Sequence, residues 1–419
     1  MSPSRRRLAE LLRRPRLARL LAVMNRDGEE TRLVGGAVRN ALIGRPVSEF
    51  DLASTALPGE VARRAEAAGF KPVPTGIEHG TVTVVVEGEP FEVTTLREDV
   101  ETDGRRARVR FGRDFEADAR RRDFTVNALS VGADGTLFDY TGGFADLAAR
   151  RIRFIGDPAA RIREDYLRIL RFFRFHATYA AGPPDPEGLA AAERARDGLA
   201  LLSPERIRAE TLKLLAAPRA LDTVAVMAEH GLLLPVLGGA AEFGRLARAA
   251  AAGSDPVRRL GALAVLSELD ADRLRARLRL SNDEHERLLA YAGMVARLKS
   301  LEGPLDGRGV RQLVAAHGVL PVDDALAAVA GEPRPLAAPD AAAALGAFRS
   351  GSEPVPRLPL RGADLVAAGI PPGPRIGELI ARARLAWLAQ GCPTGPGVRE
   401  ALLGQALDVA EGTAKATRV

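Results

Sequence analysis

Residues 31–55 read TRLVGGAVRNALIGRPVSEFDLAST, and they contain the strongest local pattern in the N-terminal part of the chain. The apolar residues 33–34 predict the end of a β-strand, and the apolar spacing over 37–42 predicts a helix. Between them, Gly35 and Gly36 predict a turn. A glycine turn that leads into a helix lets backbone N–H groups approach a phosphate without a Cβ in the way, and the helix dipole adds positive potential. The stretch therefore indicates a phosphate-binding turn.

Two acidic residues follow this helix. Glu49 and Asp51 lie on what we predict to be a second short strand. Residues two apart on a strand point the same way, so their carboxylates are expected to lie side by side. Paired oxygen ligands near a phosphate turn suit Mg²⁺ that is shared with the substrate's phosphates. The alternative is an ordinary solvated pair, but together with the glycine turn the pattern favours metal-assisted phosphoryl or nucleotidyl transfer.

The composition bounds the class of protein. A chain of 419 residues exceeds one compact core, so we expect two to four domains. A hydrophobic fraction of 46% without a long uncharged apolar run argues for a soluble protein without a membrane partner. The single cysteine, Cys392, excludes a disulfide framework. The net charge of +6 suggests an anionic partner, although a GC-rich genome would also explain the excess of Arg over Lys.

The first twenty residues are rich in arginine, and Glu10 is their single acid. This composition loosely resembles a transit peptide. Residues 8–24 (LAELLRRPRLARLLAVM) also fit an amphipathic helix that packs on the following domain, and no cleavage-like region separates them from the first strand. We prefer the helix, and a cytoplasmic location follows from it.

Further patterns describe the rest of the N-terminal part. Residues 58–69 predict a helix, and the runs 80–87 and 91–95 predict a β-hairpin. Glu92 on the second run is a candidate third carboxylate for the metal, or else a surface acid. Residues 97–112 are charged and have no period, so we expect a mobile loop with a functional role.

Beyond about residue 150 the strand pattern nearly disappears, and helical segments follow one another, among them 158–180 and 204–216. A stretch rich in Pro, Ala and Gly over 331–359 resembles a linker around one helix. The sequence therefore predicts an α+β protein with a small mixed head and a long all-helical arm.

The segment RRDFTVNAL, residues 121–129, is the second motif with chemical content. Arg122 offers a forked cation for phosphate, while Asp123 and Asn127 can bond ribose hydroxyls. For an isolated motif, a capped helix start with surface charges would be the better interpretation. A third motif, residues 139–147 (DYTGGFADL), reads as a structural turn in which Asp139 caps or braces the backbone.

The most informative motif is EDYLRILRFFRF, residues 164–175. Asp165, Arg168, Arg171 and Arg174 recur every three residues and are expected to form one helix stripe. An ion-paired solvent face is the alternative. The large apolar residues around the stripe instead suggest a partly buried helix, whose arginines need anionic partners. A nucleoside triphosphate would supply them.

Asp165 and Arg168 also form a selective pair. Cytosine and adenine each present an amino donor beside a ring-nitrogen acceptor, which a carboxylate and a guanidinium would match. Guanine and uracil present the reverse pattern. The pair would therefore admit C and A and reject G and U. Downstream, Arg206 and Glu210 share a helix face and either brace this helix or form an ordinary surface pair.

The ordered motifs GGAVRNALIGRPVSEFD, RRRDFTVNAL, DYTGGFADL, EDYLRILRFFRF and ERIRAE resemble those of bacterial class II tRNA nucleotidyltransferases and poly(A) polymerases, most closely the CCA-adding members. The resemblance implies a polymerase-beta-like nucleotidyltransferase head with a mixed sheet, followed by an all-helical neck, body and tail. The corresponding divisions are 1–150 for the head, 151–255 for the neck, 256–335 for the body and 336–419 for a tRNA-binding tail.

The resemblance also implies a function and residue roles. CCA-adding members add C, C and A to the tRNA 3′ end from CTP and ATP with Mg²⁺ and without a nucleic-acid template. The implied metal and catalytic residues are Glu49 and Asp51, with Glu92 as a further catalytic candidate. The implied nucleotide-binding residues are Gly35, Gly36, Arg39, Arg122, Asp123, Asn127, Asp165, Arg168, Arg171 and Arg174.

Two positions depart from the family pattern. Asn40 stands where the glycine motif usually ends in Asp, which affects local bracing. Glu49 stands where the first metal-binding Asp is usual, and its extra methylene displaces the carboxylate by about an ångström, enough to affect a metal-dependent rate. We expect a backbone shift to compensate, so that activity persists.

Three other functions fit the motifs less well. A poly(A) polymerase would carry a more basic run before the second motif and a very basic C-terminal tail, whereas this chain has RVRFGRDF and ends in EGTAKATRV. A partial enzyme that adds only CC or only A is a second alternative. A non-catalytic RNA-binding protein is a third, against which the retained arginines argue.

Overall fold

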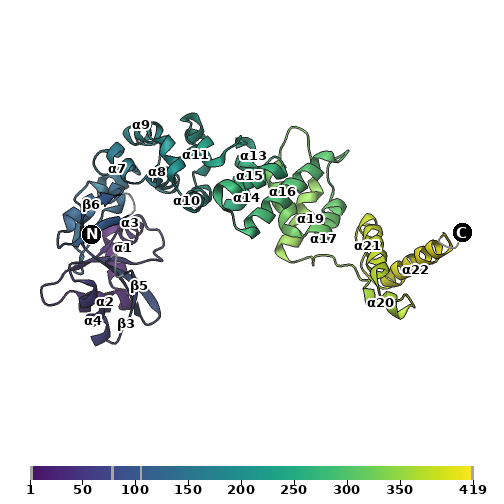
Figure 1. Cartoon of the computed structure of the whole chain (residues 1–419), viewed down its shortest axis with the longest axis horizontal. Coiled ribbons are helices and arrows are strands. Elements are labelled where there is room, and N and C mark those ends of the chain that lie inside the picture. Colours follow the sequence, from purple (N-terminus) through teal and green to yellow (C-terminus); the bar gives the residue numbers. More distant parts are fainter. Residues whose placement is uncertain (1–2, 77–79, 104–105, 417–419) are drawn as a thin grey trace. The chain divides into compact units, whose positions relative to one another are not determined.

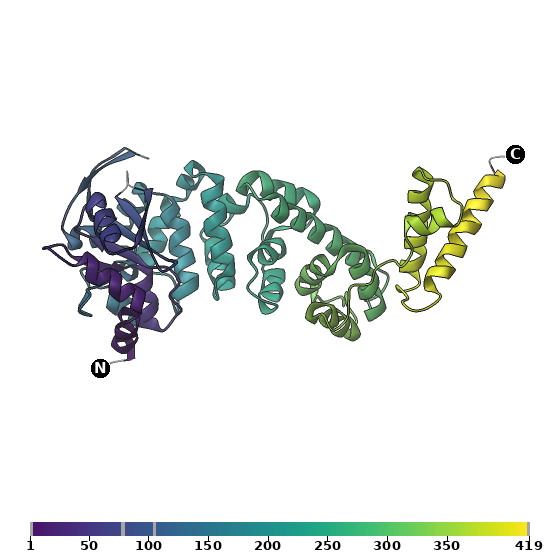
Figure 2. The same cartoon turned by 90° about the horizontal axis from the view of Figure 1, so that it is seen from below.

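The computed structural model describes residues 3–76, 80–103 and 106–416, and it divides into two compact units, Met1–Val236 and Leu237–Val419. Figures 1 and 2 show the strands in the purple and blue part of the ribbon and helices alone from teal to yellow. The expected α+β organisation is therefore confirmed for the described residues.

The first unit contains a seven-stranded mixed sheet in the order β3-β4-β5-β2-β1-β8-β9. Its strands are β1 Thr31–Val34, β2 Asp51–Ser54, β3 Lys71–Gly76, β4 Thr81–Val86, β5 Glu89–Thr95, β8 Ser130–Val131 and β9 Leu137–Phe138. β2 and β5 are parallel, and the other neighbours are antiparallel. The predicted hairpin is β4–β5, in which alternate side chains of β4 are buried. The parallel register places Asp51 directly beside Glu92.

Helices pack against this sheet. α3 spans Gly36–Ile43, and the predicted helix after the acidic pair is α4, Pro58–Ala67. The prediction of one N-terminal helix over 8–24 is wrong in one respect: α1 spans Pro3–Leu12 and α2 spans Pro15–Met24. Pro15 has no N–H to continue α1, and its fixed φ suits the first turn of a new helix. Both helices bury leucines against the first unit, as expected.

The prediction of a loop over 97–112 is wrong. The segment contains an antiparallel pair of strands, β6 Arg97–Asp103 and β7 Arg106–Phe111. The register sets the acidic run of β6 opposite the basic run of β7, with Glu98 beside Arg110. Neither run alternates apolar with polar residues, which is why the period-2 pattern of a half-buried strand is missing.

Helices follow the sheet in the first unit. Two of these, α7 and α8, span Pro158–Glu164 and Leu167–Tyr179. The prediction of one continuous helix over 158–180 is therefore wrong, because Asp165 has an extended backbone (φ −157°, ψ 108°). Its Oδ1 accepts the N–H of Leu167 at 3.0 Å, which caps the start of α8. The remaining elements of this unit are α5 Phe115–Arg120, the short 3₁₀ turns Thr125–Asn127 and Arg196–Leu201, α6 Gly143–Ala148, α9 Pro186–Arg194, α10 Pro204–Ala216 and α11 Ala220–Glu229.

The core between the sheet and α8 is aromatic. Phe172 of α8 is fully buried, and its ring centroid lies 5.4 Å from that of Phe154 and 6.3 Å from that of Phe124. Phe124 lies within the second sequence motif, directly after Asp123. The same packing thus fixes both the RRD segment and α8, the two parts that carry the predicted nucleotide-binding residues.

The described residues of the second unit form helices. They are α13 Phe243–Ala251, α14 Pro256–Ala264, α15 Glu268–Leu278, α16 Asn282–Ser300, α17 Gly307–His317, α18 Val319–Val329, α19 Pro339–Ser350, α20 Gly362–Ala367, α21 Pro374–Ala389 and α22 Val398–Ala416, with α12 Leu234–Leu237 at the boundary. Arg258 of α14 bonds Asp324 of α18 at 2.7 Å, and Trp387 of α21 is almost fully buried. The Ala-rich helix expected within 331–359 is α19.

Candidate active site

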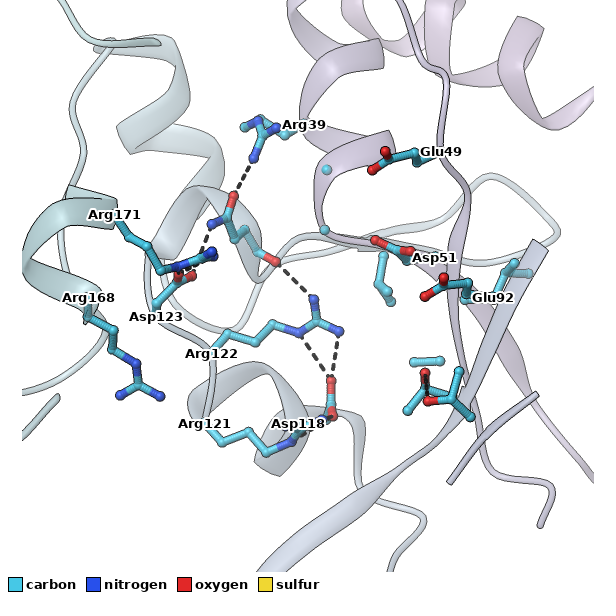
Figure 3. Close-up of a pocket in the computed structure, with 18 of the residues that line it drawn as sticks. Arg39, Glu49, Asp51, Glu92, Asp118, Arg121, Arg122, Asp123, Arg168 and Arg171 are labelled. Carbon is cyan, nitrogen blue, oxygen red and sulfur yellow. Dashed lines mark hydrogen bonds and ion pairs between the residues drawn. The ribbon is translucent and has the colours of Figure 1, made fainter. Parts of the chain in front are cut away.

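A cleft of about 940 Å³ lies within the first unit. It is bordered by the start of α3, by β2 and β5, by the segment 118–127 and by the start of α8. Figure 3 shows acidic side chains on one side of this cleft and arginines on the other. The cleft brings together all but one of the residues that the sequence analysis selected. They are Gly35, Gly36, Arg39, Glu49, Asp51, Glu92, Arg122, Asp123, Asn127, Asp165, Arg168 and Arg171.

Three carboxylates form the acidic side of the cleft: Glu49, Asp51 and Glu92. They point into the same space in Figure 3. The expectation that Glu49 lies on the strand with Asp51 is wrong, because β2 begins at Asp51 and Glu49 lies in the preceding segment. Burial raises the pKa of Asp51, and the negative charges of Glu92 and Glu49 raise it further, while Arg122 lowers it. Three like charges held this close favour a bound cation.

The acidic side of the cleft suits a metal ion that takes some of its ligands from the protein and the others from substrate and water. Within 3–76, 80–103 and 106–416, no group of three His, Cys, Asp or Glu is placed to hold an ion unaided. Mg²⁺ is commonly bound through one or two carboxylates plus substrate phosphates and water. Asp51 and Glu92, side by side on parallel strands, offer such a partial set of ligands.

The glycine turn has the predicted strand–turn–helix form. Gly35 has φ of 65°, a conformation that glycine adopts without strain, and its N–H donates to the Leu129 carbonyl at 3.0 Å. A Cβ on Gly35 would stand 3.1 Å from Nη1 of Arg122. The turn therefore lets an arginine approach the backbone at the start of α3.

Arg39 on α3 is buried and has neutral hydrogen-bond partners. It donates to the Asn127 side chain, to Oδ1 of Asn40 at 3.0 and 3.2 Å, and to the Tyr179 hydroxyl at 2.6 Å. Its guanidinium also lies over the Tyr179 ring, 4.1 Å from the centroid. Burial lowers the pKa of Arg39. Asn40, which departs from the family's Asp, thus orients Arg39 without neutralising its charge.

Asp123 joins the segment after the sheet to α8. It accepts hydrogen bonds from Asn127 at 3.0 Å and from Arg171 at 2.8 Å. Burial by itself would raise the pKa of Asp123, but the charge of Arg171 and these bonds outweigh it and lower the pKa. Since Asn127 also binds Arg39, an unbroken hydrogen-bonded chain runs from Arg39 through Asn127 and Asp123 to Arg171.

The sequence analysis missed Asp118, which holds two adjacent arginines. Its Oδ1 accepts from Nε of Arg121 at 2.9 Å, and its Oδ2 accepts from Nε and Nη2 of Arg122 at 3.2 and 3.1 Å. The carboxylate is 6% exposed. A carboxylate three and four residues before an Arg pair on a helix is a recognisable spacing, and it could have revealed this residue.

Asp165 and Arg168 line the cleft from the joint between α7 and α8. Their side chains have separate partners: the Asp165 carboxylate accepts from Arg206 at 2.7 Å, while the Arg168 guanidinium pairs with Glu164 and donates to the Arg161 carbonyl at 2.9 Å. Asp165 is not part of a helix stripe, contrary to the prediction.

The Tyr166 side chain, next to Asp165, packs closely against Gly198. A Cβ at position 198 would stand only 2.0 Å from Cδ1 of the Tyr166 ring.

Arg174 lies apart from the cleft lining. It pairs with the buried Glu210 of α10 and lies over the ring of Phe175, 4.2 Å from the centroid. The expectation that Arg174 completes the base pocket is not supported by its position. Bracing of α8 by α10 is confirmed, since Arg206 and Glu210 both bond to it or to its capping residue Asp165. Likewise Asp139 accepts the N–H groups of Gly143 and Phe144 at 2.9 Å, as expected for a brace.

Comparisons with known proteins identify the family of the chain. A family model described as the Poly A polymerase head domain matches residues 31–153, and one described as a probable RNA and SrmB-binding site of polymerase A matches residues 184–243. The CCA-adding enzyme of Limosilactobacillus fermentum is 34% identical over 370 residues, which cover 86% of this chain and 89% of that enzyme. The chain belongs to the family of CCA-adding enzymes.

Other CCA-adding enzymes share its sequence and fold. The mitochondrial CCA tRNA nucleotidyltransferase 1 of Danio rerio is 41% identical over 276 residues; the match covers 64% of each chain, less than two thirds of that relative. The crystal structure of the Bacillus stearothermophilus CCA-adding enzyme in complex with CTP superimposes with a TM-score of 0.73 at 26% identity, over 99% of this chain and 100% of that one. The mixed seven-stranded sheet is thus the expected polymerase-beta-like head. The described helices include none with the length and apolarity to cross a membrane.

Proposed function

We propose that this chain adds C, C and A to the 3′ end of tRNA from CTP and ATP, without a nucleic-acid template. One observation carries the proposal: the carboxylates Glu49, Asp51 and Glu92 line the same cleft as Asp165 and Arg168. Figure 3 shows Arg168 on the side of this cleft opposite the carboxylates. A nucleoside triphosphate fits between a cation site and a pair of base-reading groups. The membership in the CCA-adding family supports the same assignment.

The chain's own residues position both reactants. Nucleotidyltransferases of this family generally use a divalent metal, and we propose that Asp51 and Glu49, helped by Glu92, hold Mg²⁺. A metal held by these residues would supply activation of the attacking hydroxyl and charge neutralisation at the leaving pyrophosphate. The N–H groups at Gly35 and Gly36 and the cations Arg39 and Arg122 orient the triphosphate for in-line attack, because an anion is stabilised at a helix N-terminus.

Base choice is assigned to the joint before α8. The Asp165 carboxylate accepts the amino group that cytosine and adenine share, and the Arg168 guanidinium donates to the adjacent ring nitrogen. Guanine and uracil would place a carbonyl oxygen against the Asp165 carboxylate and a ring N–H against the Arg168 guanidinium, so that acceptor would face acceptor and donor would face donor. Arg171, tied to Asp123, keeps α8 fixed against the phosphate side of the cleft.

The remaining assignments extend this proposal. The finer division at residues 150, 255 and 335, with a tail that holds tRNA by its backbone, suits an all-helical arm that recognises shape. A cytoplasmic location is our expectation, and the Danio rerio relative is a mitochondrial enzyme. The second candidate function is poly(A) addition, which the description of the matching head family favours.

A stepwise assay tests the proposal. The purified chain is incubated with tRNA that lacks CCA, CA or A, and each labelled nucleotide is offered separately. We expect two C residues on the first substrate, C then A on the second, and one A on the third, after which extension stops. Continued addition of A would indicate a poly(A) polymerase, and activity on only one substrate would indicate a partial enzyme. Nucleotide binding without any extension would contradict catalysis with Glu49.

A further inference from the structure

Asp118 occupies an unusual electrostatic position beside the cleft. Its carboxylate is buried, and its two oxygens are divided between two guanidinium groups, Oδ1 for Arg121 and Oδ2 for Arg122. Both arginine side chains are about one quarter exposed, at 25% and 24%. One buried acid therefore holds two cations, and the trio carries a net positive charge at the edge of the cleft.

Each of the three nitrogens of the Arg122 guanidinium donates a hydrogen bond to a protein group. Asp118 takes Nε and Nη2, while Nη1 donates to the Asn127 carbonyl at 3.3 Å and approaches the Gly35 turn. Figure 3 shows the Arg122 guanidinium between Asp118 and the carboxylates of Asp51 and Glu92. The guanidinium thus lies within the field of two acidic groups on opposite sides.

The two sides compete for the same cation. No ion pair joins Glu49, Asp51 or Glu92 to an arginine in the part of the chain that the structure describes. Their mutual repulsion favours any cation that can reach them, and the Arg122 guanidinium would be such a cation if it were released from Asp118. Asp118 opposes that attraction with two charge-assisted hydrogen bonds at 3.1 and 3.2 Å, which are among the stronger polar contacts in proteins.

We infer that Asp118 is a positioning residue that keeps the Arg122 guanidinium at the glycine turn and off the metal-binding carboxylates. In its absence Arg122 pairs with Asp51 and competes with the divalent cation, while the triphosphate loses an oriented donor. The inference rests on the proposed function in one respect, that Asp51 belongs to the cation site.

Direct Mn²⁺ binding to the full-length protein, followed by electron paramagnetic resonance without nucleotide, tests the inference. Asp118→Asn keeps the shape of the side chain and removes its charge, and we expect it to weaken Mn²⁺ binding by about five- to tenfold because a competing cation then sits beside the ion. Arg122→Gln in the same background should restore the affinity to at least the wild-type value. Arg121→Gln is the matched control, since it frees the same carboxylate of its other partner, and should leave Mn²⁺ affinity within about twofold.

The outcomes are distinguishable. Unchanged Mn²⁺ affinity in Asp118→Asn, or failure of the double variant to recover it, overturns the inference. A merely structural loss would persist in the double variant, which carries the same substitution. Asp51→Asn must abolish the strong Mn²⁺ site; if it does not, the proposed cation site is wrong and the inference falls with it. If Asp51→Asn abolishes the site and Asp118→Asn does not weaken it, the inference alone fails.

Discussion

The two sides of the cleft prepare for a nucleotide in opposite ways. The acidic side, Glu49, Asp51 and Glu92, has like charges held together, and no ion pair to it occurs in the described ranges. The arginines of the other side, Arg168 and Arg171 of α8, are already paired with protein carboxylates, as is Arg174 farther along the same helix. The acidic side favours a cation because its negative charge is uncompensated. The arginine side keeps its side chains in fixed positions because carboxylates of the protein hold them.

This difference predicts different costs of substitution. On the acidic side a lost carboxylate removes repulsion, so the fold should tolerate the change while chemistry fails. On the arginine side a lost partner leaves a desolvated charge behind, so stability should suffer with function. Four experiments test this contrast, and they are given in order of decreasing expected effect.

The largest effect is expected for Asp51→Ala. Loss of a carboxylate from the cation site should lower nucleotide incorporation by about a thousandfold or more. Single-turnover extension of tRNA that lacks the final A measures it. tRNA binding and the melting temperature should change little, because removing one of three like charges relieves repulsion. A parallel fall in melting temperature would mean that Asp51 supports the fold, and the contrast would not hold.

Next is Glu210→Ala on α10. Its loss leaves Arg174 without its buried partner, and we expect the free energy of unfolding to fall by about 3 kcal/mol. Chemical denaturation of the full chain measures it. Glu205→Ala on the same helix is the matched control, because Glu205 is exposed and its loss should change stability by less than about 0.5 kcal/mol. Equal effects of the two changes would show that the buried pair adds nothing specific.

Asp165→Asn tests base reading at the joint. An amide can still cap α8, but it presents a donor where the carboxylate accepted, so discrimination of CTP over UTP should fall by about tenfold to a hundredfold. Competition between the two nucleotides measures it. Asp157→Asn, at the exposed cap of α7, should leave the discrimination unchanged. If selectivity survives Asp165→Asn, the base is read elsewhere.

The smallest effect concerns the charge coupling within the acidic side. Glu92 raises the pKa of Asp51, so Glu92→Gln should lower that pKa, and Glu49→Gln should lower it less because Glu49 contributes less. Carboxyl chemical shifts followed over a pH titration of the metal-free protein measure the change. The acid limb of the pH–rate profile should move to lower pH, since Asp51 then stays ionised in more acidic solution. A pKa that rises or stays constant would show that the three groups are not coupled.

Much of the fold followed from local patterns. A period or a turn residue fixes each of three features: the strand–turn–helix at Gly35, the hairpin that carries Glu92, and the helical remainder. The β6–β7 hairpin was missed, because acidic and basic runs carry no apolar alternation. The break before α8 was missed for a different reason: Asp165 caps a new helix through its side chain, while the apolar spacing continues across the break.

The site was predictable as a set of residues but less so as a geometry. Glu49 reaches the cleft from outside the strand, so the argument from strand alternation was wrong although the two carboxylates do meet. Arg174 satisfies the three-residue spacing but pairs with Glu210 outside the cleft lining. Residues spaced by three rotate gradually around a helix, so Arg174 does not share the direction of Arg168. Asp118 was overlooked because a buried acid beside two arginines reads as surface charge until the packing of α5 is known.

The contact between Tyr166 and Gly198 has a further consequence. The aromatic ring occupies the space where any other amino acid at position 198 would place its first carbon. A larger residue there must displace the ring, and with it the backbone next to Asp165. If Asp165 reads the base as we propose, a substitution at Gly198 is expected to change base selectivity while every charged group of the cleft stays the same.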